Sequence, residues 1–172
     1  MRTLLSALGL LLLSAIAPRA EAAVLTVDVS APGTPLTGFD LEADLTQSVS
    51  TGAGTYVFTG LEGAVVLDGT SYAVSDATLT ASGGAFSLAL PGEFGGTNGL
   101  VVTLLGTATL PEDAASAFLA IRSAGFAVVA YTQAGVPTTG FGPASVAAQI
   151  PLPPAAALFA LPFGLAAWRR IA

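Results

Sequence analysis

The sequence predicts an all-β protein, an antiparallel β-sandwich of about 8–9 strands, with an N-terminal signal helix and a C-terminal transmembrane helix. From Val24 onward, segments of five to eight residues rich in Val, Leu, Phe, Tyr and Thr alternate with Gly, Pro, Asp or Ser clusters. Helical periodicity does not dominate this stretch. Longer apolar runs lie near the two ends of the chain, which predicts a targeting segment at each end and a β-rich body between them.

The N-terminal segment 1–22 has the pattern of a secretory signal peptide. Arg2 precedes an apolar stretch from Leu4 to Ala17, and the small-residue pattern Ala20-Glu21-Ala22 follows it. We expect cleavage between Ala22 and Ala23, and therefore an exported protein. The alternative, a retained N-terminal anchor, needs about 20 apolar residues and no cleavage site.

Residues 23–133 form the predicted sandwich body, and 134–149 are expected to be a linker or a last strand. Glycine-bounded segments of strand-forming residues place the expected strands. These are Val24–Ser30, Phe39–Thr46, Gly54–Gly60, Gly63–Leu67, Thr70–Val74, Ala77–Ala81, Ala85–Leu90, Leu100–Leu110 and Gly125–Thr132. Long loops dense in glycine, proline or threonine are expected at Ala31–Gly38, Pro91–Gly99 and Ala134–Pro143.

Three local patterns in the body are the most specific. Apolar and acidic residues alternate from Phe39 to Leu45, which predicts a strand with one buried and one solvated face. Asp68-Gly69 between two apolar segments predicts a type I′ hairpin. Pro111-Glu112-Asp113 predicts the start of a short helix over Ala114–Ile121, with a strand at 117–121 as the alternative.

Composition excludes many kinds of active site. The chain has no cysteine, histidine or lysine, which excludes disulfides, Ser-His-Asp triads, Schiff bases and His-ligated zinc. The body carries ten carboxylates against one base, Arg122, for a net charge near −9. Such a surface repels nucleic acid and other polyanions, whereas divalent cations could bridge it. We expect no cofactor and no nucleic-acid partner.

Only carboxylates remain as candidate site residues in the body. Asp40, Glu42 and Asp44 would lie about 6.5 to 7 Å apart on one strand face, as weak candidates for Ca²⁺ ligands. The alternative is a solvated strand face that resists edge pairing. Glu62 with Asp68, or Glu93 with Glu112, could serve glycoside hydrolysis only if the fold brought a pair about 5 to 9.5 Å apart. No motif supports such a pair, so the sequence predicts a protein that is not an enzyme.

The C-terminal segment 150–172 carries three features in order. The proline motif Ile150-Pro-Leu-Pro-Pro154 precedes an apolar run of 14 residues, Ala155–Trp168, and the basic pair Arg169-Arg170. At about 1.5 Å per residue this run makes a helix of about 21 Å, against a hydrocarbon core of about 30 Å. Pro162 weakens the helix further. The run would therefore insert weakly, with the arginines on the cytoplasmic side.

This terminus resembles the C-terminal sorting signals of the PEP-CTERM class, in the variant whose motif reads Val-Pro-Leu-Pro-Ala. The matching residues are Pro151, Leu152, Pro153, Pro154 and Ala155, with Ile150 in place of valine and one inserted proline. The chain also departs from the pattern at Pro162 and by ending in two arginines rather than a longer basic cluster. The resemblance covers about 23 of the 172 residues.

The resemblance implies a Gram-negative exported protein that an exosortase, a membrane-embedded cysteine peptidase or transpeptidase, cuts near the proline motif. It implies anchoring in the inner membrane before processing, and the cell surface or biofilm matrix, with its extracellular polysaccharide, afterwards. A simple tail anchor with a proline-rich linker is the alternative. The expected function is that of a non-enzymatic surface or matrix protein. A carbohydrate-binding or, less favoured, carbohydrate-cleaving β-sandwich, with or without Ca²⁺, is the alternative function.

Overall fold

The computed structural model describes residues 22–151, of which Ala22–Ile150 form one compact unit. The expected signal helix and transmembrane helix lie outside the described residues. Within 22–151, no helix is long and apolar enough to cross a membrane.

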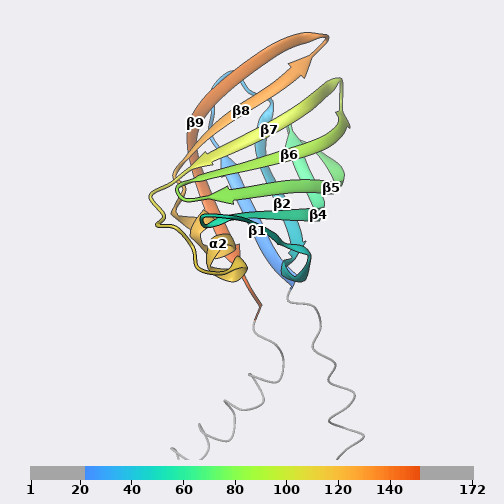
Figure 1. Cartoon of the computed structure of the whole chain (residues 1–172). Helices are drawn as coiled ribbons and strands as arrows, with labels where there is room; N and C mark the ends of the chain where they lie inside the picture. The colour runs from blue at the N-terminus through green and yellow to red at the C-terminus, as the bar shows by residue number, and fades with distance from the viewer. Residues whose placement is uncertain (1–21, 152–172) are drawn as a thin grey trace, which may run out of the picture. The chain divides into compact units, whose positions relative to one another are not determined.

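The body consists of nine antiparallel strands with one short α-helix and two single turns of 3₁₀ helix (Figure 1). The prediction of an antiparallel all-β body is therefore confirmed. The strands are β1 (Ala22–Val29), β2 (Leu36–Asp44), β3 (Val49–Gly52), β4 (Thr55–Leu67), β5 (Thr70–Ser82), β6 (Ala85–Phe94), β7 (Thr97–Leu105), β8 (Phe126–Gln133) and β9 (Val136–Gln149). The helical elements are η1 (Leu45–Gln47), α2 (Ala114–Ala120) and η2 (Ile121–Ser123).

Eight of the strands close into a barrel, so the predicted sandwich is wrong. The strands follow the order β2-β1-β9-β8-β7-β6-β5-β4, and β2 also pairs with β4, which closes the ring. Strand β3 lies outside the ring and pairs only with the N-terminal part of β4. An alternating pattern has the same form in a sandwich and in a barrel. The distinction rests on two long-range pairings, β1 with β9 and β2 with β4, that no local pattern specifies.

Glycines in β4 allow the ring to close. The register of β4 against β5 shifts on either side of Leu61, and Gly60 and Gly63 both have positive φ. A Cβ on Gly63 would collide with the backbone carbonyl oxygen of Asp40 in β2. Glycine at this position therefore lets β2 approach β4, and the bulges bend β4 from one neighbour to the next.

Two pairs of predicted strands are single long strands in the structure. Apart from Gly54, the predicted strands Gly54–Gly60 and Gly63–Leu67 are both part of β4, and the glycines at its bulges have the same sequence pattern as a break between strands. Thr70–Val74 and Ala77–Ala81 are both part of β5, where Asp76 has a positive φ of 58°. A bulge and a turn share the same glycine and aspartate signals, which explains the difference.

The three expected long loops are also wrong in extent. The first is shorter, because β2 already begins at Leu36. The second contains the two-residue turn Gly95-Gly96 between β6 and β7, and the third contains the turn Ala134-Gly135 between β8 and β9. All four of these turn residues have positive φ, which suits tight hairpins. The segment expected as a linker or last strand thus contains β9. The Asp68-Gly69 hairpin is confirmed, with φ of 49° and 77°.

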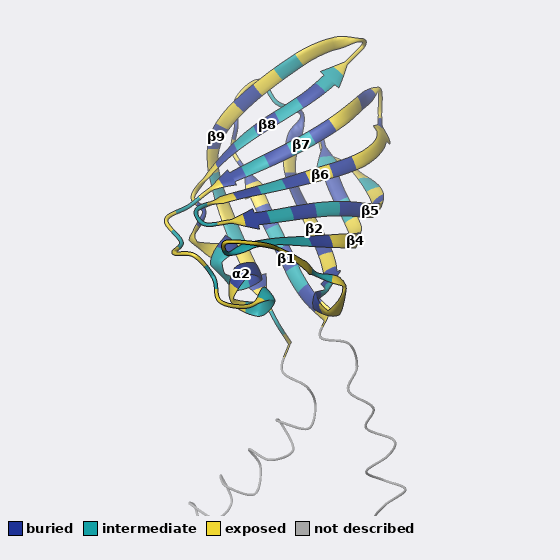
Figure 2. Cartoon of the chain, viewed as in Figure 1, coloured by how far each residue is buried: buried dark blue, intermediate teal, exposed yellow. Residues whose placement is uncertain are grey.

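Apolar side chains fill the barrel. Buried and exposed residues alternate along the strands (Figure 2), and the inward positions carry the apolar ones. The largest fully buried side chains include Phe58, Phe86, Leu41, Leu88 and Leu104. An eight-stranded barrel is just wide enough for such side chains to occupy its interior.

Helix α2 lies across one end of the barrel. It contacts β9 on one side and β4 and β5 on the other. Phe118 is fully buried, and its ring meets that of Phe58 edge-on at a centroid distance of 5.7 Å. The predicted helix over 114–121 is confirmed, and its N-cap is Asp113, whose Oδ1 accepts a hydrogen bond from the Ser116 backbone N–H at 2.6 Å.

Candidate functional site

Both ends of the described body emerge at the same end of the barrel. Val24 of β1 pairs with Gln149 of β9 in an antiparallel ladder, so the start of the first strand and the end of the last strand are neighbours. Ile150 is half-buried and Pro151 is exposed. The other sorting-motif residues and the basic pair lie outside the described residues. The predicted motif therefore begins directly after a barrel strand, without a spacer.

The predicted signal-cleavage bond lies at the start of β1. Ala22 is the first residue of this strand and pairs with Asp44, and Ala23 pairs with Ala43 and is fully buried. A peptidase needs an accessible, extended bond. A cut at this position therefore has to precede the pairing of Ala23 with β2.

The three acidic residues of β2 do not converge on one point. Phe39, Leu41 and Ala43 are buried, which confirms the predicted alternation, and Asp40 and Glu42 point outward on the solvent side. Among residues 22–151, no group of three His, Cys, Asp or Glu side chains is arranged to hold a metal ion.

Asp44 has a different role from its two neighbours. Its Oδ1 accepts hydrogen bonds from the Thr46 hydroxyl at 2.6 Å and the Thr46 backbone N–H at 2.9 Å, and its Oδ2 accepts one from Gln47 at 3.3 Å. These hydrogen bonds hold the pKa of Asp44 below its usual value, and the bond from the Thr46 hydroxyl has the largest effect. The carboxylate caps η1.

Glu62 joins Asp40 and Glu42 on the outer wall of the barrel. It pairs with Glu42 across β2 and β4, and the three carboxylates line a shallow hollow of about 390 Å³. No local pattern predicts this grouping, because 20 residues separate the paired glutamates. Like charges directly opposite each other on two strands repel. The arrangement is therefore a source of local repulsion.

Neither predicted acid pair is brought together. Glu62 and Asp68 are six positions apart along β4 and its turn, roughly 20 Å at about 3.3 Å per residue, too far for an acid and base pair. Glu93 is near the β6–β7 turn, whereas Glu112 precedes α2 at the opposite end of the barrel.

Two exposed phenylalanines form an apolar surface that the sequence did not reveal. Phe126 of β8 and Phe141 of β9 are 38% and 66% exposed, and their rings stack with centroids 6.3 Å apart. Leu105 of β7 pairs with Phe126, and Val128 pairs with Phe141. We call Leu105, Phe126, Val128, Phe141 and Pro143 the apolar flank. The register that unites these residues is set by long-range strand pairing.

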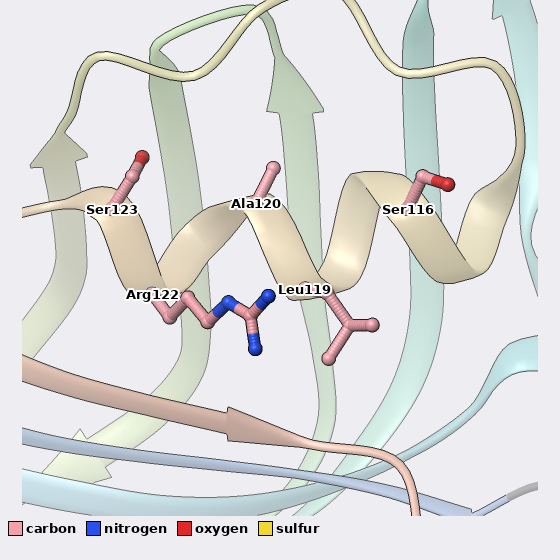
Figure 3. Close-up of a pocket in the computed structure, with 5 residues that line it drawn as sticks. All are labelled: Ser116, Leu119, Ala120, Arg122 and Ser123. Atoms are coloured by element: carbon pink, nitrogen blue, oxygen red, sulfur yellow. The ribbon is translucent and has the colours of Figure 1, made fainter.

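A second hollow, of about 320 Å³, lies along α2 and η2 (Figure 3). It includes Arg122, the one basic side chain among residues 22–151. Figure 3 shows Arg122 and Leu119 on one side of the helix and the hydroxyls of Ser116 and Ser123 on the other. The cation and the hydroxyls therefore do not point toward one common ligand.

Comparisons of this chain with protein-family models, with curated proteins and with solved structures gave no match.

Proposed function

We propose that this is an exported, non-enzymatic surface or extracellular-matrix protein, delivered by a C-terminal sorting signal that an exosortase-type membrane peptidase processes. The observation that carries the proposal is the order of features in residues 150–172. A proline motif, a short apolar run and a basic pair follow one another in a chain that starts with a signal-peptide pattern. An apolar run of 14 residues interrupted by Pro162 anchors weakly, which suits temporary retention.

The position of the motif relative to β9 supports removal of the tail. Strand β9 ends at Gln149, and the motif begins at Pro151. A cut between residues 150 and 155 would leave every β1–β9 pair intact, from Val24 with Gln149 to Val29 with Ala144. The released product would therefore keep its closed barrel.

The apolar interior of the barrel and the outward direction of its acidic side chains support a role exerted through the outer surface. Fully buried phenylalanines and leucines occupy the inside of the barrel. The acidic side chains of β2 and β4 point outward, and neither of the acid pairs considered for glycoside hydrolysis, Glu62 with Asp68 or Glu93 with Glu112, is brought together. A surface or matrix component needs no catalytic group.

Carbohydrate binding is the second candidate function. The stacked, exposed rings of Phe126 and Phe141 favour it, since sugars pack on aromatic faces. The Ca²⁺-assisted form of this function lacks support, because the carboxylates of β2 and β4 are separated from β8 by three or four strand positions around the ring.

Processing is tested with the full chain in a Gram-negative cell that has an exosortase and in a matched cell that lacks it. The first cell should release or transfer the body, and the second should retain the uncut chain at its inner membrane. Replacing Pro151 and Pro153 with alanine should block the cut while leaving the apolar run unchanged. As a control, the exposed prolines Pro32 and Pro91 are replaced with alanine, and cutting should continue. Release of the Pro151→Ala, Pro153→Ala variant at the normal rate would contradict the proposal.

A further inference from the structure

Charge is distributed unevenly around the barrel. Strands β7, β8 and β9 contain no charged residue. The acidic residues that lie within strands are on β1, β2, β4, β5 and β6. One side of the barrel wall is therefore neutral, and the remainder is acidic. The neutral side is also where the apolar flank is exposed. We propose that the apolar flank is a contact surface between two copies of this chain.

The flank has the composition of the centre of a protein interface. Its outward positions carry two aromatic rings, Leu105, Val128 and Pro143, and Leu105 is 43% exposed. Interface centres are enriched in aromatic residues and depleted of charge. Adjacent apolar side chains on the surface of a soluble protein mark interaction sites more often than isolated ones do.

The charge of the chain makes this surface a better place for contact with a second copy than the acidic walls are. The body has a net charge near −9, so two bodies repel each other wherever their acidic walls meet. At physiological salt this repulsion extends over about 8 Å. Contact through β7, β8 and β9 keeps most of the acidic residues of both copies away from the contact and leaves Asp28 of β1, opposite Ser145, at its edge. The flank thus offers an approach with buried apolar area and little repulsion.

A protein surface suits the flank better than a sugar does. The flank has no amide, carboxylate or guanidinium group. The outward polar side chains that border it carry hydroxyls, those of Thr103, Thr139 and Ser145, and the nearest carboxylate is that of Asp28, which pairs with Ser145. Small-ligand sites are concave and place several polar groups around the ligand. The outer wall of a closed barrel is convex. The same two rings can pack against their equivalents in a second copy without such polar groups.

The absence of cysteine from the chain permits a direct test with the full protein in intact exporting cells. Thr139→Cys places one thiol beside Phe141, on the same face of β9, and Ser71→Cys places one on exposed β5 as the control. A bis-maleimide with a spacer that spans the flank is then added. We expect the Thr139→Cys chain to be captured as a cross-linked dimer and the Ser71→Cys chain to remain a monomer.

Two further variants separate contact at the flank from general proximity. Adding Phe141→Asp to the Thr139→Cys chain introduces a charge into the contact and should lower the dimer yield at least tenfold. Val49 is 58% exposed on β3, outside the flank, so adding Val49→Asp should leave the yield unchanged. Equal cross-linking of the Thr139→Cys and Ser71→Cys chains would overturn the proposal. Capture of the Thr139→Cys chain only after polysaccharide digestion would overturn it in favour of a sugar, and no capture at all would also overturn it.

Discussion

The helix that crosses the end of the barrel should contribute a large share of its stability through Phe118. This side chain is fully buried and meets the fully buried Phe58 edge-on. Truncating a buried phenylalanine to alanine costs about 3–5 kcal/mol, because apolar contacts are lost and a cavity remains. With an m-value of about 2 kcal/mol/M in urea, Phe118→Ala should lower the unfolding midpoint of residues 23–151 by about 2 M.

Phe141→Ala is the matched control, since it makes the same chemical change at a ring that is 66% exposed. It should change the free energy of unfolding by no more than about 0.5 kcal/mol in the monomer. The double variant Phe58→Ala, Phe118→Ala should cost less than the sum of the single variants, because the edge-on pair adds about 0.5–1.5 kcal/mol of coupling. If Phe118→Ala were as mild as Phe141→Ala at equal m-value, the docking of α2 in the barrel end would be refuted.

Three further measurements test the local arguments. Gly140→Ala should destabilise the body by about 1–3 kcal/mol, because its Cβ would collide with the loop after β1, whereas Gly125→Ala, with open space around it, should change stability by less than about 1 kcal/mol in denaturant titrations. Hydrogen bonds to the carboxylate, above all the one from the Ser116 backbone N–H, lower the pKa of Asp113. The stability that this carboxylate contributes to the folded body is therefore complete above about pH 4 and is lost as the pH falls through the lowered pKa. The stability difference between the wild type and Asp113→Ala should therefore shrink in acid, and a difference that grows in acid would contradict this. Glu62→Gln should stabilise the body by about 0.2–1 kcal/mol by relieving repulsion from Glu42, and added salt should reduce the gain.

Local patterns were sufficient for the elements whose cause is local. The alternation in β2, the Asp68-Gly69 hairpin and the Asp113-capped helix all depend on residues within a few positions of one another. The closed ring depends instead on the pairing of Val24 with Gln149 and on the close approach of β2 to β4 at Gly63. Neither feature has a local signature, so the expected sandwich was wrong.

The outer surface of the barrel was less accessible to sequence reasoning. Carboxylates are the site residues that the sequence predicts, because their chemistry is specific, yet Asp44 caps η1 and Glu42 faces Glu62. Phe126 and Phe141 are 15 residues apart, and only the β8–β9 register brings their rings together. Aromatic residues in a strand-rich sequence are more often interpreted as core, which is why the apolar flank was not predicted.

The mass of the exported product tests the proposed function most directly. In a cell with a matching exosortase, intact-mass spectrometry of the extracellular or surface form should give a chain that begins at Ala23 and ends between Ile150 and Ala155. A processing-deficient cell should give a chain that begins at Ala23 and still carries the C-terminal segment. If residues 155–172 remain on the extracellular product of the processing-competent cell, the sorting-signal proposal fails, and the segment is a simple tail anchor.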